Sequence, residues 1–204
     1  MAWIDKYIPA ADIPEGQSNE WRVERFAVSE QDAAFHNMRC AFAFGSRGRE
    51  IAPGTYTRLC RGGQIVMSDT PAEKRDHYGA VLSAKGRVLV SGLGLGVVAQ
   101  AMLLKPEVQQ VTVVEISGDV MALVLPTLQE RFGARLRVVQ ADTRTWKPGL
   151  PKGTKYDYCW HDIWDTICGD NYEDMKLLRR RFGRWAAKQG CWAGDATKDA
   201  AHGR

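Results

Sequence analysis

The sequence predicts an α/β fold in which helices flank a doubly wound, mostly parallel sheet, with a smaller β-rich extension at the N-terminus. Two observations predict it. From Arg87 to Ala193, short apolar runs alternate with helix-compatible segments, which is typical of parallel strands joined by helices. Before residue 70, short β-prone runs are separated by glycine and proline, which indicates antiparallel strands. We therefore expect a β-rich extension over residues 1–70 and an α/β domain over residues 71–204.

The stretch Arg87–Glu115 is a predicted strand–turn–helix–strand unit. The apolar run Val88–Val90 leads into three glycines at alternate positions, and a helical segment, Val97–Leu104, follows directly. A second apolar run, Val111–Val114, ends in a lone carboxylate, Glu115. Glycines let the backbone bend sharply beneath a ligand, and a carboxylate at the end of the second strand can accept hydrogen bonds from two ribose hydroxyls. The unit therefore indicates a nucleotide or nucleoside site.

The sequence after this unit predicts two more helices and three more strands. In order they are Gly118–Phe132 (helix), Leu136–Val139 (strand), Tyr156–His161 (strand), Asp174–Lys188 (helix) and Gln189–Ala193 (strand). Pro126 should kink or break the first of these helices. The polar tail Asp195–Arg204 is expected to be frayed, and the α/β domain to be shortened at its C-terminus.

The N-terminal extension is predicted to be an arm followed by a β meander. Residues 1–20 lack a periodic pattern, although Trp3, Ile4, Tyr7 and Ile8 can pin them to the domain. Ser29 is expected to cap a helical turn, with Asp32 as its partner, and Thr70 and Pro71 to start a helix that runs to about Ala84. The predicted strands are Trp21–Val28, Arg39–Phe44, Thr55–Cys60 and Ile65–Met67.

The composition excludes several classes of protein. Hydrophobic residues make up 45% and charged residues 25% of the chain, as in ordinary globular proteins, and the net charge of +4 permits an acidic partner without implying one. No apolar run approaches the roughly 20 residues that span a bilayer, and the first residues do not form a signal peptide, so we expect a cytoplasmic protein. The five scattered cysteines show no zinc-ligand spacing, and no metal site is predicted.

Four motifs resemble, in order and spacing, the cofactor-side motifs of class I S-adenosylmethionine-dependent methyltransferases. They are Val88–Gly96, Val111–Glu115, Arg137–Asp142 and Tyr156–Asp162. Within that superfamily the spermidine-synthase-like branch is the most similar, since it has a β-rich extension and a glutamate–histidine pair that Glu73 and His77 match. The resemblance implies a Rossmann-like fold and S-adenosyl-L-methionine as the cofactor.

The resemblance also implies a role for each residue that falls on a motif. The turn residues that would pass beneath the methionine and ribose of the cofactor are Gly92, Leu93, Gly94 and Gly96. Glu115 would hold the ribose 2′- and 3′-hydroxyls, and Ile116 would press on the adenine. Asp142 would accept a hydrogen bond from the adenine amino group, with Thr143 beside it.

The candidate catalytic residues are Asp162, Asp165 and His77. Asp162 would contact the cofactor and orient or deprotonate an acceptor amine or hydroxyl in line with the sulfonium. His161 should point to the opposite face of its strand, because successive side chains of a strand alternate, and we interpret it as structural.

Two departures and a second pattern leave alternatives open. Val90 stands where these methyltransferases usually carry an acid, and Leu95 where aminopropyltransferases carry one, which disfavours polyamine synthesis. Gly94–Ala99 also fits the dinucleotide pattern G-x-G-x-x-A, so a nicotinamide cofactor stays open. The open functions are methyl transfer to a small-molecule or macromolecular acceptor, aminopropyl transfer, and a non-catalytic binding or assembly module. A homo-oligomer is also open.

The basic cluster Arg179–Arg181, with Arg184 and Lys188 after it, is interpreted as a solvated helix face. A contact with nucleic acid stays open, but no recognisable nucleic-acid-binding module accompanies these charges.

Overall fold

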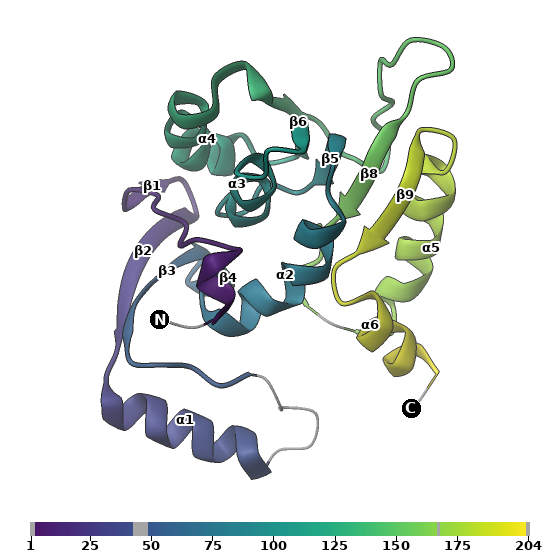
Figure 1. The fold of residues 1–204 in the computed structure, drawn as a ribbon. Helices are drawn as coiled ribbons and strands as arrows, with labels where there is room; N and C mark the ends of the chain where they lie inside the picture. Colours follow the sequence, from purple (N-terminus) through teal and green to yellow (C-terminus); the bar gives the residue numbers. More distant parts are fainter. Residues whose placement is uncertain (1–2, 43–48, 167, 203–204) are drawn as a thin grey trace.

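The structure is a computed structural model that describes residues 3–42, 49–166 and 168–202. Its centre is a parallel sheet with the strand order β7-β6-β5-β8-β9 (Figure 1). The strands are β5 (Gly86–Ser91), β6 (Val108–Glu115), β7 (Leu136–Gln140), β8 (Tyr156–His161) and β9 (Ala186–Cys191). This order runs outward on both sides of the first central strand, as in Rossmann-like sheets, and confirms the predicted fold class.

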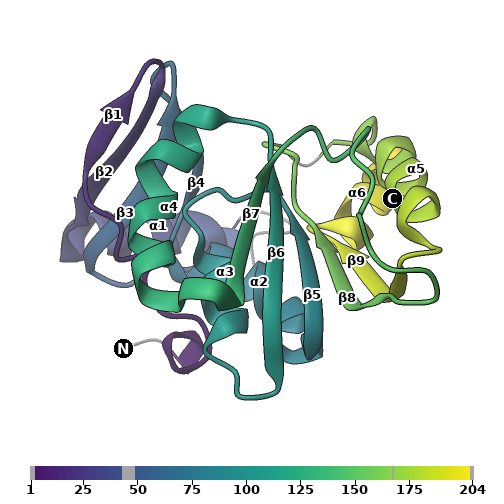
Figure 2. The ribbon, with the colours of Figure 1, turned by 90° about the horizontal axis from the view of Figure 1, so that it is seen from above.

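Helices cover both faces of the parallel sheet (Figure 2). They are α2 (Pro71–Ser83), α3 (Val97–Leu103), α4 (Gly118–Phe132), α5 (Asn171–Phe182) and α6 (Gly194–Ala201), with a short 3-10 helix at Gly133–Arg135. Val88 and Val90 pack in one core with α2, α3 and α4, whereas Leu89 packs in a second core with α5. Alternate side chains of β5 therefore serve opposite faces, and the sheet is doubly wound as expected.

The N-terminal extension forms an antiparallel sheet that packs against the same core. Its strands are β1 (Gly16–Ser18), β2 (Trp21–Val28), β3 (Gly54–Arg61) and β4 (Gln64–Ser68), in that order across the sheet. A 3-10 helix, Trp3–Lys6, precedes it, and Ile4 and Ile8 are fully buried, so the predicted arm is pinned to the domain. Because these residues share one core with Val88, the division at residue 70 stays a prediction.

The structure corrects one predicted strand in the extension. In place of a strand at Arg39–Phe44, helix α1 (Glu30–Phe42) continues through Phe42, and positions 43 and 44 lie outside the described residues. The predicted cap explains the helix, since Ser29 Oγ accepts from Asp32 N at 3.1 Å and Asp32 accepts from Ser29 N at 3.3 Å. A capped start and tertiary context therefore outweigh the local β propensity of the segment.

Two corrections concern the helices of the α/β domain. The helix predicted over Asp174–Lys188 ends at Phe182, and β9 begins at Ala186 because this segment pairs with β8. The tail predicted to be frayed is helical as far as Ala201, in α6, and positions 203 and 204 lie outside the described residues. Helix α4 continues through Pro126, so the predicted break does not occur, and the alternative, a kink at Pro126, stays a prediction. Among the described residues, no helix has the length and apolar character that crossing a membrane requires.

Candidate functional site

A cavity of about 630 Å³ opens at the carboxyl ends of β5, β6 and β8, under the antiparallel sheet. Its volume lies in the range of small-molecule sites, about 300–1,000 Å³. Ten of the residues predicted for the site line it, namely His77, Gly92, Leu93, Gly94, Glu115, Ile116, Asp142, Thr143, Asp162 and Asp165. Gly96 is not among the lining residues. The fold thus brings together side chains that are up to 88 positions apart in the sequence, from His77 to Asp165.

The glycines of the turn after β5 make room for the protein itself as well as for a ligand. Gly92 has φ +93°, and a Cβ there would lie 2.0 Å from the backbone oxygen of Asp162. Gly96 has φ +73°, and a Cβ there would lie 2.4 Å from the Leu128 side chain on α4. Gly92 therefore lets the ends of β5 and β8 meet, and Gly96 is explained by helix packing.

The backbone donors of the same turn are largely engaged within the protein. Four N–H groups have acceptors: Gly92 N to Val114 O (2.9 Å), Leu93 N to Glu115 Oε2 (2.7 Å), Leu95 N to Met67 Sδ (3.1 Å) and Gly96 N to Leu93 O (2.8 Å). Dinucleotide sites use such donors, together with a helix N-terminus, to bind a pyrophosphate. Here four of the turn's donors are occupied and a carboxylate lies beside them, which favours a ligand without phosphate at this turn.

Glu115 ends β6 with its carboxylate turned toward the glycine turn. Its side chain is buried, Oε2 accepts from Leu93 N, and Oε1 accepts from Ser117 N at 2.7 Å. These bonds fix the orientation of the carboxylate, and each oxygen has a second lone pair. Glu115 can therefore accept two further hydrogen bonds from hydroxyls of a ligand in the cavity.

Three neighbouring residues complete this end of the cavity. Ile116 is 65% exposed and offers an apolar surface. Asp142 Oδ1 accepts from Arg144 N at 2.8 Å, which holds the turn after β7. Thr143 is buried, with its hydroxyl 2.9 Å from that of Ser91. An apolar platform beside a carboxylate is suited to a purine ring with an exocyclic amino group.

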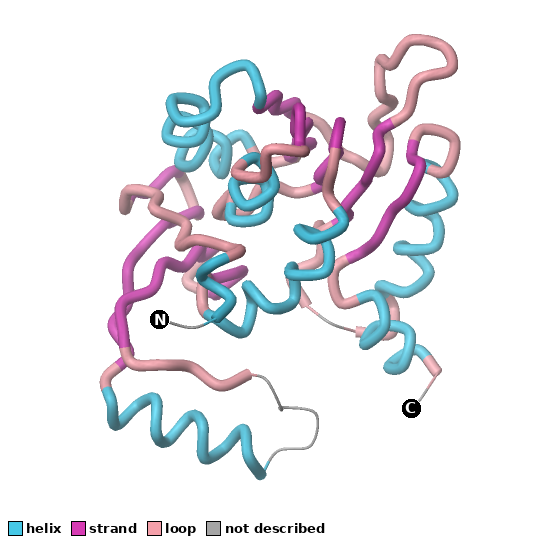
Figure 3. The backbone as a smooth tube through the Cα atoms, viewed as in Figure 1, coloured by secondary structure: helices cyan, strands magenta, loops and turns pink. Residues whose placement is uncertain are grey.

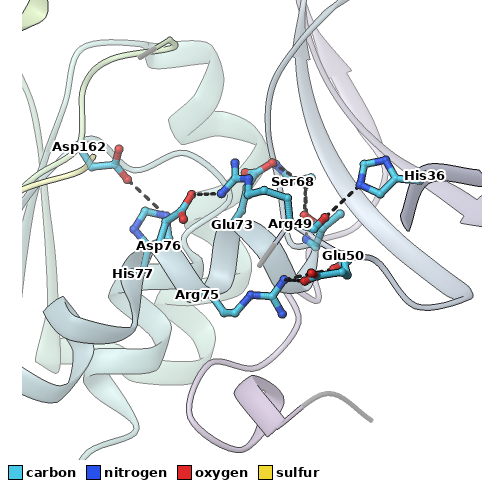
Figure 4. Close-up of polar contacts among 10 residues, drawn as sticks. His36, Arg49, Glu50, Ser68, Glu73, Arg75, Asp76, His77 and Asp162 are labelled. Carbon is cyan, nitrogen blue, oxygen red and sulfur yellow. Dashed lines mark hydrogen bonds and ion pairs between the residues drawn. The ribbon is translucent and has the colours of Figure 1, made fainter. Parts of the chain in front are cut away.

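Glu73, His77 and Asp162 line another part of the cavity, and Figure 4 shows Asp162 facing His77. Asp162 Oδ2 lies 3.7 Å from His77 Nε2, and burial, together with the nearby carboxylates of Glu73, Asp76 and Asp165, raises the pKa of Asp162 to about 7. Burial lowers the pKa of His77 to about 4, so the imidazole is neutral near pH 7. Burial also raises the pKa of Glu73, which accepts from Ser68 N and Oγ at 2.7 Å.

The arginines that line the cavity are already paired. The pairs are Arg49 with Asp76 (2.6 Å), Arg61 with Asp165 (2.8 Å) and Arg144 with Asp174 (2.8 Å). In the described part of the chain, no charged side-chain nitrogen of a lysine or arginine lies within 4.0 Å of the carboxylates of Glu73, Glu115, Asp142 or Asp162. Among the described lining residues, Glu115 and Asp142 therefore add negative charge that no arginine or lysine side chain pairs, and this charge favours a cationic ligand.

Several lining residues come from the antiparallel sheet and were not predicted for the site. They are Trp21, Leu59, Arg61, Val66 and Met67, and Trp192 after β9 joins them. Met67 reaches over the glycine turn, where its Sδ would lie 2.2 Å from a Cβ on Gly94. The sequence before residue 86 offers one signal of this side of the cavity, the spacing of Glu73 and His77 on α2, since residues four apart share a helix face.

His161 lies away from the cavity. It is fully buried, its Nδ1 lies 2.9 Å from Ser91 Oγ, and its ring contacts Phe182 in the core under α5. Burial lowers its pKa to about 4. These contacts agree with the structural interpretation of this residue. The basic cluster at the end of α5 and just after it is partly engaged, because Arg181 donates to the Trp146 carbonyl and Arg184 stacks on Trp185.

We expect Gly92→Ala to destabilise the protein far more than Gly133→Ala. At position 92 the new Cβ meets the backbone of Asp162, which cannot rotate away, and we expect a loss of about 3 kcal/mol or more in the free energy of unfolding. Gly133 also has positive φ, +52°, but nothing lies within 4 Å of its Cβ position, so the loss should be about 1 kcal/mol. Urea unfolding of both variants measures the difference; equal losses would contradict the close approach at Gly92.

Asp162 should make the stability of the protein fall as the pH rises. Its folded-state pKa is about 7 against an ordinary 3.8, so between about pH 4 and pH 7 the folded chain keeps a proton that the unfolded chain has lost. The free energy of unfolding decreases across this window. Asp162→Asn removes the penalty, and should stabilise the protein at pH 8 by on the order of 2 kcal/mol more than at pH 4. Urea unfolding at both pH values tests this, and an equal effect at both would contradict it.

Neither family models nor curated proteins match this sequence. Solved structures do. The CcbJ methyltransferase of Streptomyces caelestis matches with 18% identity over 55% of this chain and 43% of its own, at a TM-score of 0.43. Coclaurine N-methyltransferase, solved with N-methylheliamine and SAH, matches with 20% identity over 58% of this chain and 34% of its own, at a TM-score of 0.44. The N-terminal domain of EvdMO1 with SAH bound matches with 14% identity over 65% of this chain and 55% of its own, at a TM-score of 0.45. The chain thus spans between about a third and just over half of these structures.

Proposed function

We propose that the cavity binds S-adenosylmethionine and that the protein transfers its methyl group to an amine. The observation that carries the proposal is the charge of the cavity, whose carboxylates outnumber their cationic partners and suit a cationic cofactor and a basic acceptor. Glu115 would bind the ribose hydroxyls, Ile116 would lie against the adenine, and Asp142 would accept from its amino group. The occupied donors of the glycine turn favour this cofactor over a dinucleotide.

Asp162 would act on the acceptor. The bound cofactor supplies an electrophilic methyl carbon on a sulfonium, which leaves as a neutral thioether when the amine nitrogen bonds to that carbon. Asp162 would hold the amine in line and accept the proton that its nitrogen loses, and a pKa of about 7 suits a group that must both take up and release a proton near neutral pH. Neutral His77 would exclude water from this end of the cavity, since it is almost fully buried.

Isothermal titration calorimetry tests whether the cavity binds S-adenosylmethionine. We expect saturable heat with S-adenosylmethionine and none with NAD. Binding of NAD alone would refute the proposal, because the glycine turn would then accept a pyrophosphate after all. The acceptor can be sought by incubating the protein with methyl-labelled S-adenosylmethionine and a cell extract, and identifying the fraction that becomes labelled.

A second candidate is aminopropyl transfer by a spermidine-synthase-like enzyme. The presence of Glu73 and His77 beside Asp162 in the cavity favours it, as the resemblance implies. Leu95 disfavours it, because this buried apolar side chain cannot contact the charged end of a decarboxylated nucleoside. Turnover of decarboxylated S-adenosylmethionine with putrescine would support this candidate. Cofactor binding without product from any acceptor pool would instead support a non-catalytic module.

A further inference from the structure

Helix α1 has an apolar face that the described part of the chain does not cover. Phe35, Met38 and Phe42 are spaced by three and four residues, so they form one stripe along the helix. Their exposed fractions are 59%, 52% and 87%. Ala33 and Cys40, the two buried residues of α1, are seven residues apart and lie on the other side.

The helix is held on that other side by the segment before β3. The Asn37 amide donates to Ile51 O at 2.9 Å and its oxygen accepts from Ile51 N at 2.8 Å. In Figures 1 and 3, α1 extends below the antiparallel sheet and away from the parallel sheet. An ordered helix that exposes three large apolar side chains in line is typical of an interaction surface.

We propose that this stripe is the interface of a two-fold symmetric dimer in which α1 packs antiparallel against α1 of a second copy. A two-fold interface must be self-complementary, and the stripe satisfies this requirement. With the axis between residues 36 and 37, Phe35 of one copy packs against Met38 of the other, and the reverse contact repeats on the far side of the axis. Both pairs match an aromatic ring with a flexible thioether side chain.

The charges beside the stripe fit the same arrangement. Asp32 and Arg39 are seven residues apart, so they flank the stripe on one side. With the axis between residues 36 and 37, Asp32 of each copy faces Ala41 of the other. Arg39 of that other copy lies two residues, or about 3 Å of helix rise, further along on the same side, and its long side chain spans this offset to give two symmetric ion pairs. Within one copy, Asp32 uses Oδ2 to cap the helix, while Arg39 lies over the Phe35 ring and has no ion pair among the described residues.

The charge of α1 disfavours a membrane as the partner that covers the apolar stripe. Glu30 and Asp32 occupy the first turn, and Arg39 is the single lysine or arginine of the helix. Helices that lie on membranes carry several lysines or arginines, because these are attracted to anionic lipids. Acidic residues at one end and a basic residue near the other suit an antiparallel copy of the same helix.

Sedimentation velocity of the full chain over a range of concentrations tests the dimer. We expect a concentration-dependent species of twice the chain mass of 22.8 kDa. Phe35→Glu and Met38→Glu should each raise the dissociation constant at least tenfold. Leu177→Glu is the matched control, because Leu177 is an exposed apolar residue of another helix, α5, and is 54% exposed; it should leave the constant unchanged.

A charge exchange tests the antiparallel arrangement. D32R and R39D should each weaken the dimer, and the double variant D32R/R39D should restore it, since the pairs re-form between copies. Loss of the helix cap would also affect the double variant, so restoration can come only from the ion pairs. A chain that is monomeric at every concentration overturns the proposal. A monomer that sediments with phosphatidylserine vesicles overturns it too and assigns the stripe to a membrane.

Discussion

Replacing Asp162 with asparagine is expected to lower kcat by about 10²–10⁴, the usual contribution of a positioned acid or base. The asparagine side chain keeps the size of the carboxyl group but cannot accept the proton of the reacting amine. Burial and neighbouring carboxylates hold the pKa of Asp162 at about 7, so the rate of the unmodified protein should rise as the pH increases through 7. The variant should lose this dependence. The measurement is product formation against pH, with the acceptor found by labelled transfer.

Asp165→Asn is the matched control for this prediction. Asp165 lies three residues further along the same loop and also lines the cavity, but its carboxylate pairs with Arg61 and is 45% exposed. We expect its replacement to reduce kcat less than tenfold, because an exposed ion pair contributes little. Full activity of the Asp162 variant would remove Asp162 from the mechanism. Equal losses from both variants would show that the whole loop, and not one carboxylate, is required.

The cavity could be predicted from the sequence where its residues lie at the ends of parallel strands. Glu115 follows an apolar run and Asp162 follows a strand rich in aromatic residues, and the carboxyl ends of parallel strands meet at one edge of the sheet. This geometry follows from the strand–helix alternation alone. Gly96 shows the limit of the argument, since it belongs to the same glycine pattern as Gly92 and Gly94 but packs against α4.

Residues whose position depends on distant packing could not be predicted. Met67 reaches the glycine turn only because the antiparallel sheet packs against α4 and shares the core of the α/β domain, and nothing near Met67 in the sequence encodes that contact. Lys188 was assigned to a helix because its neighbours have helical periodicity, yet it pairs with Tyr158 in the sheet. In both cases tertiary contacts decide the structure, and local sequence patterns cannot report them.

Glu115→Ala is expected to abolish measurable binding of S-adenosylmethionine. Hydrogen bonds to a charged group contribute about 1.5–3 kcal/mol each, so the loss of two ribose contacts should weaken binding by about 10²–10⁴. The variant should also be less stable, because Leu93 N and Ser117 N lose their acceptor. Calorimetric titration measures the affinity, and thermal unfolding without cofactor separates the two effects.

Two further variants decide how the Glu115 result is interpreted. Glu115→Gln keeps the volume of the side chain but turns an NH2 group toward one of the two backbone donors, so its affinity should also fall. Glu107→Ala removes an exposed carboxylate from the residue just before β6, at the other end of that strand from Glu115, and should leave the affinity unchanged. If Glu115→Ala binds S-adenosylmethionine as tightly as Glu107→Ala does, the ribose is not held at the carboxyl end of β6. The cofactor would then have to bind outside the cavity described above, and the assignment of Asp162 to the reaction would fall with it.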